Sequence, residues 1–260
     1  MPKIIIDAGH GGYDNGATYN GRREKDDNLE LALAVGEILS DYGVDVAYTR
    51  VDDVYQSPVE KARIANTLEG DYLISIHRNS SPMPNTYSGV QSLIFREGGV
   101  ASRMAENINQ EMSQTGYQNL GTSLRQNLAI LRRSGMPAVL VEAGFINTDA
   151  DNALLDAKFI DTAQAIADGI AGTLLQTGEI ELEDMNDGEE IYRVQTGLFR
   201  NRENAEKMAQ QLIAMGYQAV IELSDGLYAV KVGEADELDD ATELEQQLRK
   251  MGYDTLIVSR

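Results

Sequence analysis

The sequence predicts two folded parts: an α/β domain with a mostly parallel sheet flanked by helices, and a small α+β domain of the ferredoxin-like βαββαβ type. Two observations predict this division. Residues 3 to 176 alternate short runs rich in Val and Ile with helical stretches, which is typical of a parallel α/β sheet. Residues 191 to 260 instead repeat one shorter pattern twice.

In the first part, strands are expected where Val and Ile cluster and helices where apolar residues follow helical spacing. The expected strands lie near Lys3 to Asp7, Val44 to Thr49, Tyr72 to Ile76, Val90 to Phe95 and Ala138 to Glu142. The expected helices lie near Asn28 to Tyr42, Pro58 to Leu68, Val100 to Thr115 and Asp161 to Leu175. Pro58 suits a helix first turn, where its missing N–H has no helical partner.

The stretch GEIELEDMNDGEE, residues 178 to 190, holds seven acidic residues and no basic one, which predicts a solvated linker between domains at 1–177 and 191–260. Beyond it, the pattern from Tyr192 to Tyr217 recurs 36 positions later. Each copy reads as strand, turn, helix and strand, with Gly216 and Gly252 placed to end the helices. Two copies predict four antiparallel strands under two helices, with one sheet face open.

Composition restricts the chemistry. The chain of 260 residues has no cysteine, so disulfides, thiolate metal sites and a cysteine nucleophile are excluded. The net charge of -20 repels phosphate polymers, so neither nucleic acid nor a membrane is an expected partner. Because MPK leads straight into the first strand, no secretory signal is recognised. We therefore expect cytoplasmic synthesis with release by lysis or a holin, or a secreted chain whose leader was removed.

The two histidines of the chain both follow apolar runs. His10 comes just after the first predicted strand, His77 ends YLISIH, and Glu142 ends PAVLVE. Ligands of α/β sheets gather beyond the carboxyl ends of the strands, so these side chains are expected at one edge. Glu24, just before the first predicted helix, belongs near the same edge.

Two imidazoles and one carboxylate form a set that catalytic zinc sites use. We therefore expect His10, Glu24 and His77 to bind one Zn²⁺, with Glu142 as the general base. A single histidine at a strand end is more often a structural residue, but the joint placement of both favours a metal site. A phosphate loop at GHGG is excluded, because the Gly-Lys-Ser/Thr of such loops is missing.

Four ordered motifs make the resemblance specific: IIIDAGHGGYDNGA, REKDDNLELAL, SIHRNSS and MPAVLVEAGFINT. Together they resemble the zinc-dependent N-acetylmuramoyl-L-alanine amidases of the type 3 family, over about residues 3 to 175. The resemblance implies cleavage of peptidoglycan between the lactyl group of N-acetylmuramic acid and L-alanine, and the same four site residues. Arg78 and Ala143 depart from the usual pattern, so we expect them to alter the fit of the stem peptide.

The repeats in residues 191 to 260 resemble the halves of a sporulation-related repeat (SPOR) domain, most clearly at YRVQTGLF. The resemblance implies binding of glycan strands that have lost their stem peptides. Strand alternation places Tyr192, Val194 and Thr196 toward the helices. Arg193, Gln195 and Lys231 then share the open face and are the candidate glycan-binding residues, although polar residues also face water on any half-exposed sheet.

Several alternatives stay open at this point. A zinc carboxypeptidase or deacetylase acting on wall components uses similar chemistry, and a catalytically silent wall-binding protein is a rival from another class. A phage endolysin, an autolysin and a mother-cell lytic enzyme all fit the sequence. Arg132 or Arg133 either contacts a stem-peptide carboxylate or lies in a solvated turn. Asp7 is expected to support the first loop or to orient a histidine.

Overall fold

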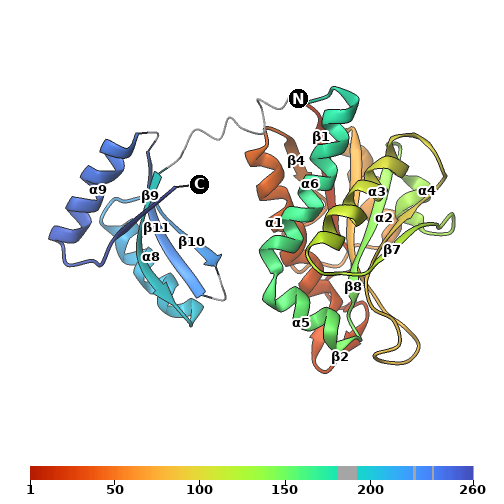
Figure 1. The fold of residues 1–260 in the computed structure, drawn as a ribbon, viewed down its shortest axis with the longest axis horizontal. Helices are drawn as coiled ribbons and strands as arrows, with labels where there is room; N and C mark the ends of the chain where they lie inside the picture. The colour runs from red at the N-terminus through yellow and green to blue at the C-terminus, as the bar shows by residue number, and fades with distance from the viewer. Residues whose placement is uncertain (181–191, 225–226, 236, 260) are drawn as a thin grey trace. The chain divides into compact units, whose positions relative to one another are not determined.

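The computed structural model describes residues 1–180, 192–224, 227–235 and 237–259. The chain divides into two compact units, Met1–Met185 and Asn186–Arg260 (Figure 1). Each unit has its own hydrophobic core. Most of the predicted acidic linker, from residue 181 to residue 190, lies outside the described residues.

The first unit contains a six-stranded sheet in the order β4-β1-β5-β8-β6-β7 (Figure 1). All neighbouring pairs are parallel except β6 and β8, so the predicted mostly parallel sheet is confirmed. Strand β7 lies at the edge of the sheet and was not predicted. The strands are β1 (Lys3–Ala8), β4 (Asp45–Tyr48), β5 (Tyr72–Asn79), β6 (Val90–Ile94), β7 (Asn119–Leu124) and β8 (Ala138–Phe145).

The predicted helices are present, together with the unpredicted short helices α4 and α5. Glu24 is the first residue of α1, so the prediction that it precedes the helix is wrong by one turn. Acidic residues at 24, 26 and 27 favour this earlier start, because they lie at the positive end of the helix dipole. The helices are α1 (Glu24–Asp41), α2 (Pro58–Thr67), α3 (Gly99–Gln114), α4 (Ala129–Arg133), α5 (Asp149–Ala157) and α6 (Phe159–Thr177), and β2 (Thr18–Tyr19) pairs with β3 (Arg22–Arg23).

Alternation along the strands divides the core into two layers. Ile4 and Ile6 of β1 pack with apolar residues of α1, α3 and α6 on one face of the sheet. Ile5 points to the other face, where Ala62 of α2 and Ile130 of α4 lie in a smaller cluster. Because β-strand side chains alternate, residues such as His77 and Glu142 lie on the α2 and α4 side.

The second unit has the strand order β10-β11-β9-β12, and all neighbouring pairs are antiparallel. This order, with two helices, is the predicted ferredoxin-like fold, which is confirmed. Gly216 and Gly252 follow the two helices with φ of 92° and 91°, a conformation that favours glycine. The elements are β9 (Tyr192–Phe199), α8 (Arg202–Ala214), β10 (Ala219–Ser224), β11 (Leu227–Ala235), α9 (Leu238–Lys250) and β12 (Leu256–Ser259).

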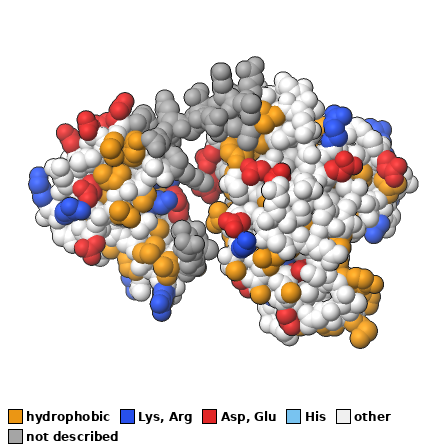
Figure 2. Space-filling view, in the orientation of Figure 1, with side chains coloured by type: hydrophobic (Ala, Val, Ile, Leu, Met, Phe, Trp, Pro, Cys, Tyr) orange, Lys and Arg blue, Asp and Glu red, His pale blue; other side chains and the backbone are white. Residues whose placement is uncertain are grey.

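The visible surfaces of both units mix acidic, basic and hydrophobic side chains (Figure 2). Within the described residues, no helix has the length and apolar character that a bilayer crossing needs.

Candidate metal centre

Three neighbouring parallel strands bring the candidate residues to one edge of the sheet. His10 follows β1, His77 lies near the end of β5, and Glu142 lies in the second half of β8. Strand β5 pairs with both β1 and β8. Glu24 reaches the same edge from the first turn of α1.

The two histidines and Glu24 converge on one point. The Nε2 of His10 lies 3.2 Å from Oε1 of Glu24, and the Nδ1 of His77 lies 2.9 Å from the same oxygen. One ligand atom from each residue lies within 4.8 Å of the other two, and the imidazole rings meet edge to face with centroids 5.0 Å apart. The structure therefore brings together all three residues that were predicted to bind the metal.

Glycines allow this close approach. A Cβ atom at Gly9 would lie 2.4 Å from the His77 ring, and one at Gly16 would lie 2.5 Å from Oε2 of Glu24. His10 itself has φ of 59°, which turns the chain sharply after β1. The glycine-rich run around His10 is thus needed for the geometry of the site.

Asp14 orients the first histidine. Its Oδ2 lies 2.9 Å from Nδ1 of His10, which leaves Nε2 directed toward Glu24. Metal-binding histidines commonly donate their second ring N–H to a carboxylate in this way. Asp14 was not predicted, because its contact with His10 depends on the turn of the backbone at residue 10.

The electrostatics of this cluster favour a cation. Burial opposes protonation of His10, but the carboxylates of Glu24 and Asp14 outweigh it and raise its pKa to about 9. Burial alone would raise the pKa of Glu24, yet the two histidines hold it well below its usual range. The pKa of His77 is also raised, because Glu24 overcomes the effect of burial.

The donor set fits zinc. Nitrogen and oxygen atoms that lie about 2.0–2.2 Å from a tetrahedral zinc are about 3.3–3.5 Å from one another. The two observed separations from Glu24 Oε1, 2.9 and 3.2 Å, are close to this spacing. Two histidines and a carboxylate also leave a fourth position for a reactant.

Glu142 lies beside the candidate metal-binding cluster. It is paired in register with His77 on the adjacent strand, so both side chains point to the same face. Its Oε2 is shielded from solvent and has no hydrogen-bond partner among the described residues. Burial raises the pKa of Glu142 to about 7. A carboxyl group with this pKa can both accept and donate a proton near neutral pH.

A buried polar network supports the loop that follows β1 and carries His10. Asp7 accepts hydrogen bonds from Thr49, Ser75 and Lys61, with donor–acceptor distances of 2.6, 2.7 and 3.0 Å. Lys61 also donates to the carbonyl of Ala8 at 2.6 Å. Asp7 thus supports the loop, which was one of its two expected roles, and none of these three hydrogen-bond partners is a histidine. Arg50 adds hydrogen bonds to the carbonyls of residues 8, 9 and 25.

The expectation that Arg78 and Ala143 shape a peptide site is not supported. Arg78 is 2% exposed and Ala143 is fully buried. The Arg78 guanidinium forms an ion pair with Asp27 at 2.5 Å and donates to Asn152 at 2.8 Å. Because residue 78 points to the face opposite His77, Arg78 ties β5 to α1 and α5 instead of facing a ligand.

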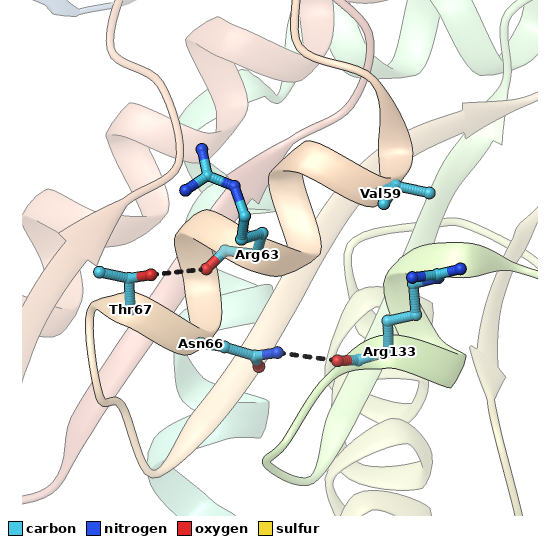
Figure 3. Close-up of a pocket in the computed structure, with 5 residues that line it drawn as sticks. All are labelled: Val59, Arg63, Asn66, Thr67 and Arg133. Atoms are coloured by element: carbon cyan, nitrogen blue, oxygen red, sulfur yellow. Dashed lines mark hydrogen bonds between the residues drawn. The ribbon is translucent and has the colours of Figure 1, made fainter.

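Arg133 lines a separate pocket of about 500 Å³ between α2 and the turn after α4 (Figure 3). Asn66 holds this turn, because it bonds the carbonyl of Arg133 and the N–H of Gly135, both at 2.8 Å. The side chains of Arg63 and Arg133 extend in different directions (Figure 3). Arg132 and Arg133 are exposed residues in the last turn of α4, before β8 begins, whereas Glu142 lies in the second half of β8. The structure therefore favours a solvated position for both arginines, although in a helix and not in the expected turn.

In the second unit, the three candidate glycan-binding residues are Arg193, Gln195 and Lys231, and they lie on the two central strands. Arg193 forms ion pairs with Glu222, at 2.7 Å, and with Glu234. Lys231 also pairs with Glu222. The open face therefore carries basic residues whose charges are already compensated by neighbouring carboxylates.

A parallel α/β sheet with a His-His-Glu cluster at its carboxyl edge, beside a buried carboxyl group, defines a candidate metal-dependent hydrolase. Comparison with known proteins gives the family. Residues 4–172 match the N-acetylmuramoyl-L-alanine amidase family model, and residues 188–259 match the SPOR domain model. The chain belongs to the N-acetylmuramoyl-L-alanine amidase family and carries a SPOR domain.

Individual relatives agree with this assignment. The chain is 35% identical over 230 residues to the sporulation-specific N-acetylmuramoyl-L-alanine amidase of Bacillus subtilis, covering 86% of each protein. It is 36% identical over 182 residues to the endolysin of Bacillus phage SPP1, covering 67% of each. The catalytic domain of the amidase CwlV from Bacillus (Paenibacillus) polymyxa var. colistinus superposes with a TM-score of 0.62 at 31% identity, covering 70% of this chain and all of that domain.

Proposed function

We propose that this protein is a zinc-dependent amidase that hydrolyses the bond between the lactyl carboxyl of N-acetylmuramic acid and L-alanine in peptidoglycan. The observation that carries the proposal is the meeting of His10, Glu24 and His77 within 4.8 Å, beside Glu142 in register on the next strand. The names of the amidase relatives support the choice of substrate.

His10, His77 and Glu24 would hold the ion. When bound, zinc would supply Lewis acidity, which would polarise the substrate carbonyl and make water more acidic. Asp14 keeps His10 in the orientation that binding needs. Because Gly9 and Gly16 have no Cβ atom, they leave room for the His77 ring and the Glu24 carboxylate to approach each other.

Glu142 moves the proton of the reaction. Its carboxylate accepts a proton from the attacking water, whose oxygen forms the new bond to the carbonyl carbon. As the bond from carbon to nitrogen breaks, Glu142 passes a proton to the leaving amino group of L-alanine. The pKa of about 7 suits both transfers, because neither protonation state is strongly favoured near neutral pH.

The test uses the full chain with purified sacculi. Cleavage should create new lactyl carboxyl groups and new N-terminal alanine in equal amounts, detected by mass spectrometry of the released peptides. A chelator should abolish release, and added zinc should restore it. Glu142→Gln should lower kcat by roughly 10²–10⁴-fold while the zinc content stays unchanged.

The rival functions give different products. A carboxypeptidase releases a single amino acid from the peptide end, a deacetylase releases acetate, and a silent wall-binding protein releases neither. Any of these results, without new N-terminal alanine, would overturn the amidase proposal. Asp45→Ala is the control, because this exposed residue begins β4 at the amino end of the sheet and is no proposed ligand or proton donor, so the variant should release N-terminal alanine as the wild type does.

For the C-terminal unit, we propose that residues 191–260 form a domain that binds peptidoglycan glycan strands stripped of stem peptides. Arg193, Gln195 and Lys231 provide polar groups on its open face. A tethered binding domain raises the local concentration of substrate. Co-sedimentation of the full chain with stripped and intact sacculi tests this: stripped material should retain more protein, and equal retention would contradict the proposal.

A further inference from the structure

Two tyrosines beside the first metal-binding loop stack on each other in solvent. The rings of Tyr13 and Tyr55 have centroids 4.1 Å apart and planes 26° from parallel. Tyr13 is 79% exposed and Tyr55 is 40% exposed. Neither ring belongs to a core cluster of the described residues, so packing of the protein interior does not explain the pair.

The loop that carries Tyr13 is held in place by several contacts. Gly11 and Asp14 form two backbone hydrogen bonds, at 3.0 and 3.1 Å, which make a tight hairpin with Tyr13 at its tip. Buried Lys25 donates to the carbonyl of Gly12 at 2.7 Å and forms an ion pair with Asp53 at 2.6 Å. The backbone that carries the exposed ring is therefore held in place before any ligand binds.

The loop of Tyr55 is locked against the same hairpin. The N–H of Gly12 donates to Asp53 at 2.7 Å. A Cβ atom at Gly11 would lie 2.2 Å from the carbonyl oxygen of Val54, and one at Gly12 would lie 2.7 Å from the backbone nitrogen of Tyr55. Because both glycines have positive φ, side chains at these positions would strain the backbone as well. The two rings thus form one preformed surface.

This surface lies close to the candidate metal centre. Tyr13 follows His10 by three residues, and three residues of extended chain span at most about 10–11 Å. Asp14, the next residue, contacts the His10 ring directly. A polymer whose scissile bond lies at the metal centre would therefore have a neighbouring unit within reach of the tyrosine rings.

The chemistry of the pair suits a sugar. One face of a pyranose ring presents C–H groups, which pack against the face of an aromatic ring. The sugar hydroxyls can donate to the carboxylates of Asp14 and Asp53, whose side chains are 38% and 50% exposed. These two carboxylates also make the surface less suitable for an acidic peptide.

We propose that the stacked rings of Tyr13 and Tyr55 form a platform for a pyranose ring of the glycan strand, next to the muramic acid unit whose amide is cleaved. This inference rests on the proposed amidase function. It assigns to the hairpin tip a role in positioning the polymer, separate from the role of His10 at its base.

The test compares Tyr13→Ala with Tyr13→Phe on a glycan oligomer of several disaccharide units that carries stem peptides. Loss of the ring should raise KM about tenfold and leave kcat within about twofold, because the contact lies away from the reacting bond. Tyr13→Phe keeps the ring and should stay within about twofold of the wild type. Ile160→Ala, a 48% exposed position on α6 at the opposite face, is the matched surface control.

The zinc content of each variant shows whether the metal centre is intact. An unchanged KM for Tyr13→Ala would overturn the platform, and so would a fall in kcat at constant KM, because that result indicates an effect on the His10 loop. A single N-acetylmuramoyl peptide has no neighbouring sugar, so Tyr13→Ala should cleave it as well as the wild type does. If the wild type releases peptide from neither substrate, the proposed function itself fails, and this outcome is distinct from the other two.

Discussion

Two regions of the molecule bring polar and charged side chains together: the sheet edge that holds His10 and the open face of the second unit. They differ in whether these side chains already have partners within the protein. At the edge, three donor atoms converge and Oε2 of Glu142 has no protein partner among the described residues. On the open face, Arg193 and Lys231 each pair with Glu222. A polar side chain is therefore available to a ligand only where the neighbouring strand does not place a pairing group beside it.

The largest expected effect on stability concerns the buried ion pair between Asp7 and Lys61. Asp7→Asn leaves the Lys61 ammonium, which is 3% exposed as a residue, without its carboxylate. We expect the free energy of unfolding of the first unit to fall by about 3–5 kcal/mol. Urea unfolding of the full chain measures this value.

The control for Asp7 comes from the other region. Glu206→Gln breaks an exposed ion pair with Arg202 in α8, and should cost less than about 0.5 kcal/mol. Equal costs for the two substitutions would contradict the view that a buried ion pair contributes more to stability than an exposed one.

The next effect is a pH dependence of stability. Burial raises the pKa of Glu142 to about 7 from 4.5, so its ionisation weakens the fold as pH rises between these values. Below pH 4 the group is protonated in both folded and unfolded states and contributes no such cost. Glu142→Gln should therefore stabilise the metal-free protein by about 3 kcal/mol above pH 8, and by nearly nothing at pH 4.

Thermal unfolding of the chelator-treated protein across this pH range checks the Glu142 prediction. A gain that is the same at both ends of the range would show that the carboxyl group is not titrating as its burial requires.

A smaller effect is expected for Asp14, which orients His10 and is 38% exposed. Asp14→Ala should weaken zinc binding about tenfold, because the His10 ring loses its hydrogen-bond acceptor. Competition with a chromophoric chelator measures the change. Asp45→Ala, which removes an exposed acid near the other end of the sheet, should leave the affinity unaltered, and a comparable loss there would show a nonspecific charge effect.

The smallest effect concerns the open face. Glu222→Gln removes the carboxylate that both Arg193 and Lys231 contact, so Lys231 becomes available to an anionic glycan while Arg193 keeps its ion pair with Glu234. We expect binding to stripped glycan strands to tighten two- to threefold at low salt, and to return to the wild-type value at high salt. Co-sedimentation measures this; weaker binding would mean that the ion pairs themselves shape the binding surface.

Much of the fold was predictable because its signals are local. The runs rich in Val and Ile identify β1, β5 and β8, and the rule for carboxyl ends of parallel strands then places His10, His77 and Glu142 together. Strand β7 escaped prediction because NLGTSL is polar and contains glycine. The antiparallel pairing of β6 with β8 depends on tertiary arrangement, which no single segment shows.

The missed parts of the site depend on backbone turns and strand pairing. The contact of Asp14 with His10 requires the left-handed conformation of residue 10, which the sequence GHGG permits but does not specify. Glu222 meets Arg193 and Lys231 only because β10 pairs with β11 in a particular register. The sequence predicted that Arg78 would affect the fit of the stem peptide, because it follows His77. Strand alternation instead directs its side chain toward Asp27.

The most direct test of the central claim is the zinc content of three purified full-length proteins, measured by elemental mass spectrometry after dialysis. Wild type and Glu142→Gln should each retain about one zinc per chain, whereas His77→Ala, shown to be folded by circular dichroism, should retain none. Full zinc in the folded His77→Ala protein, or loss of zinc in Glu142→Gln, would contradict the assignment of ligands and proton carrier made here.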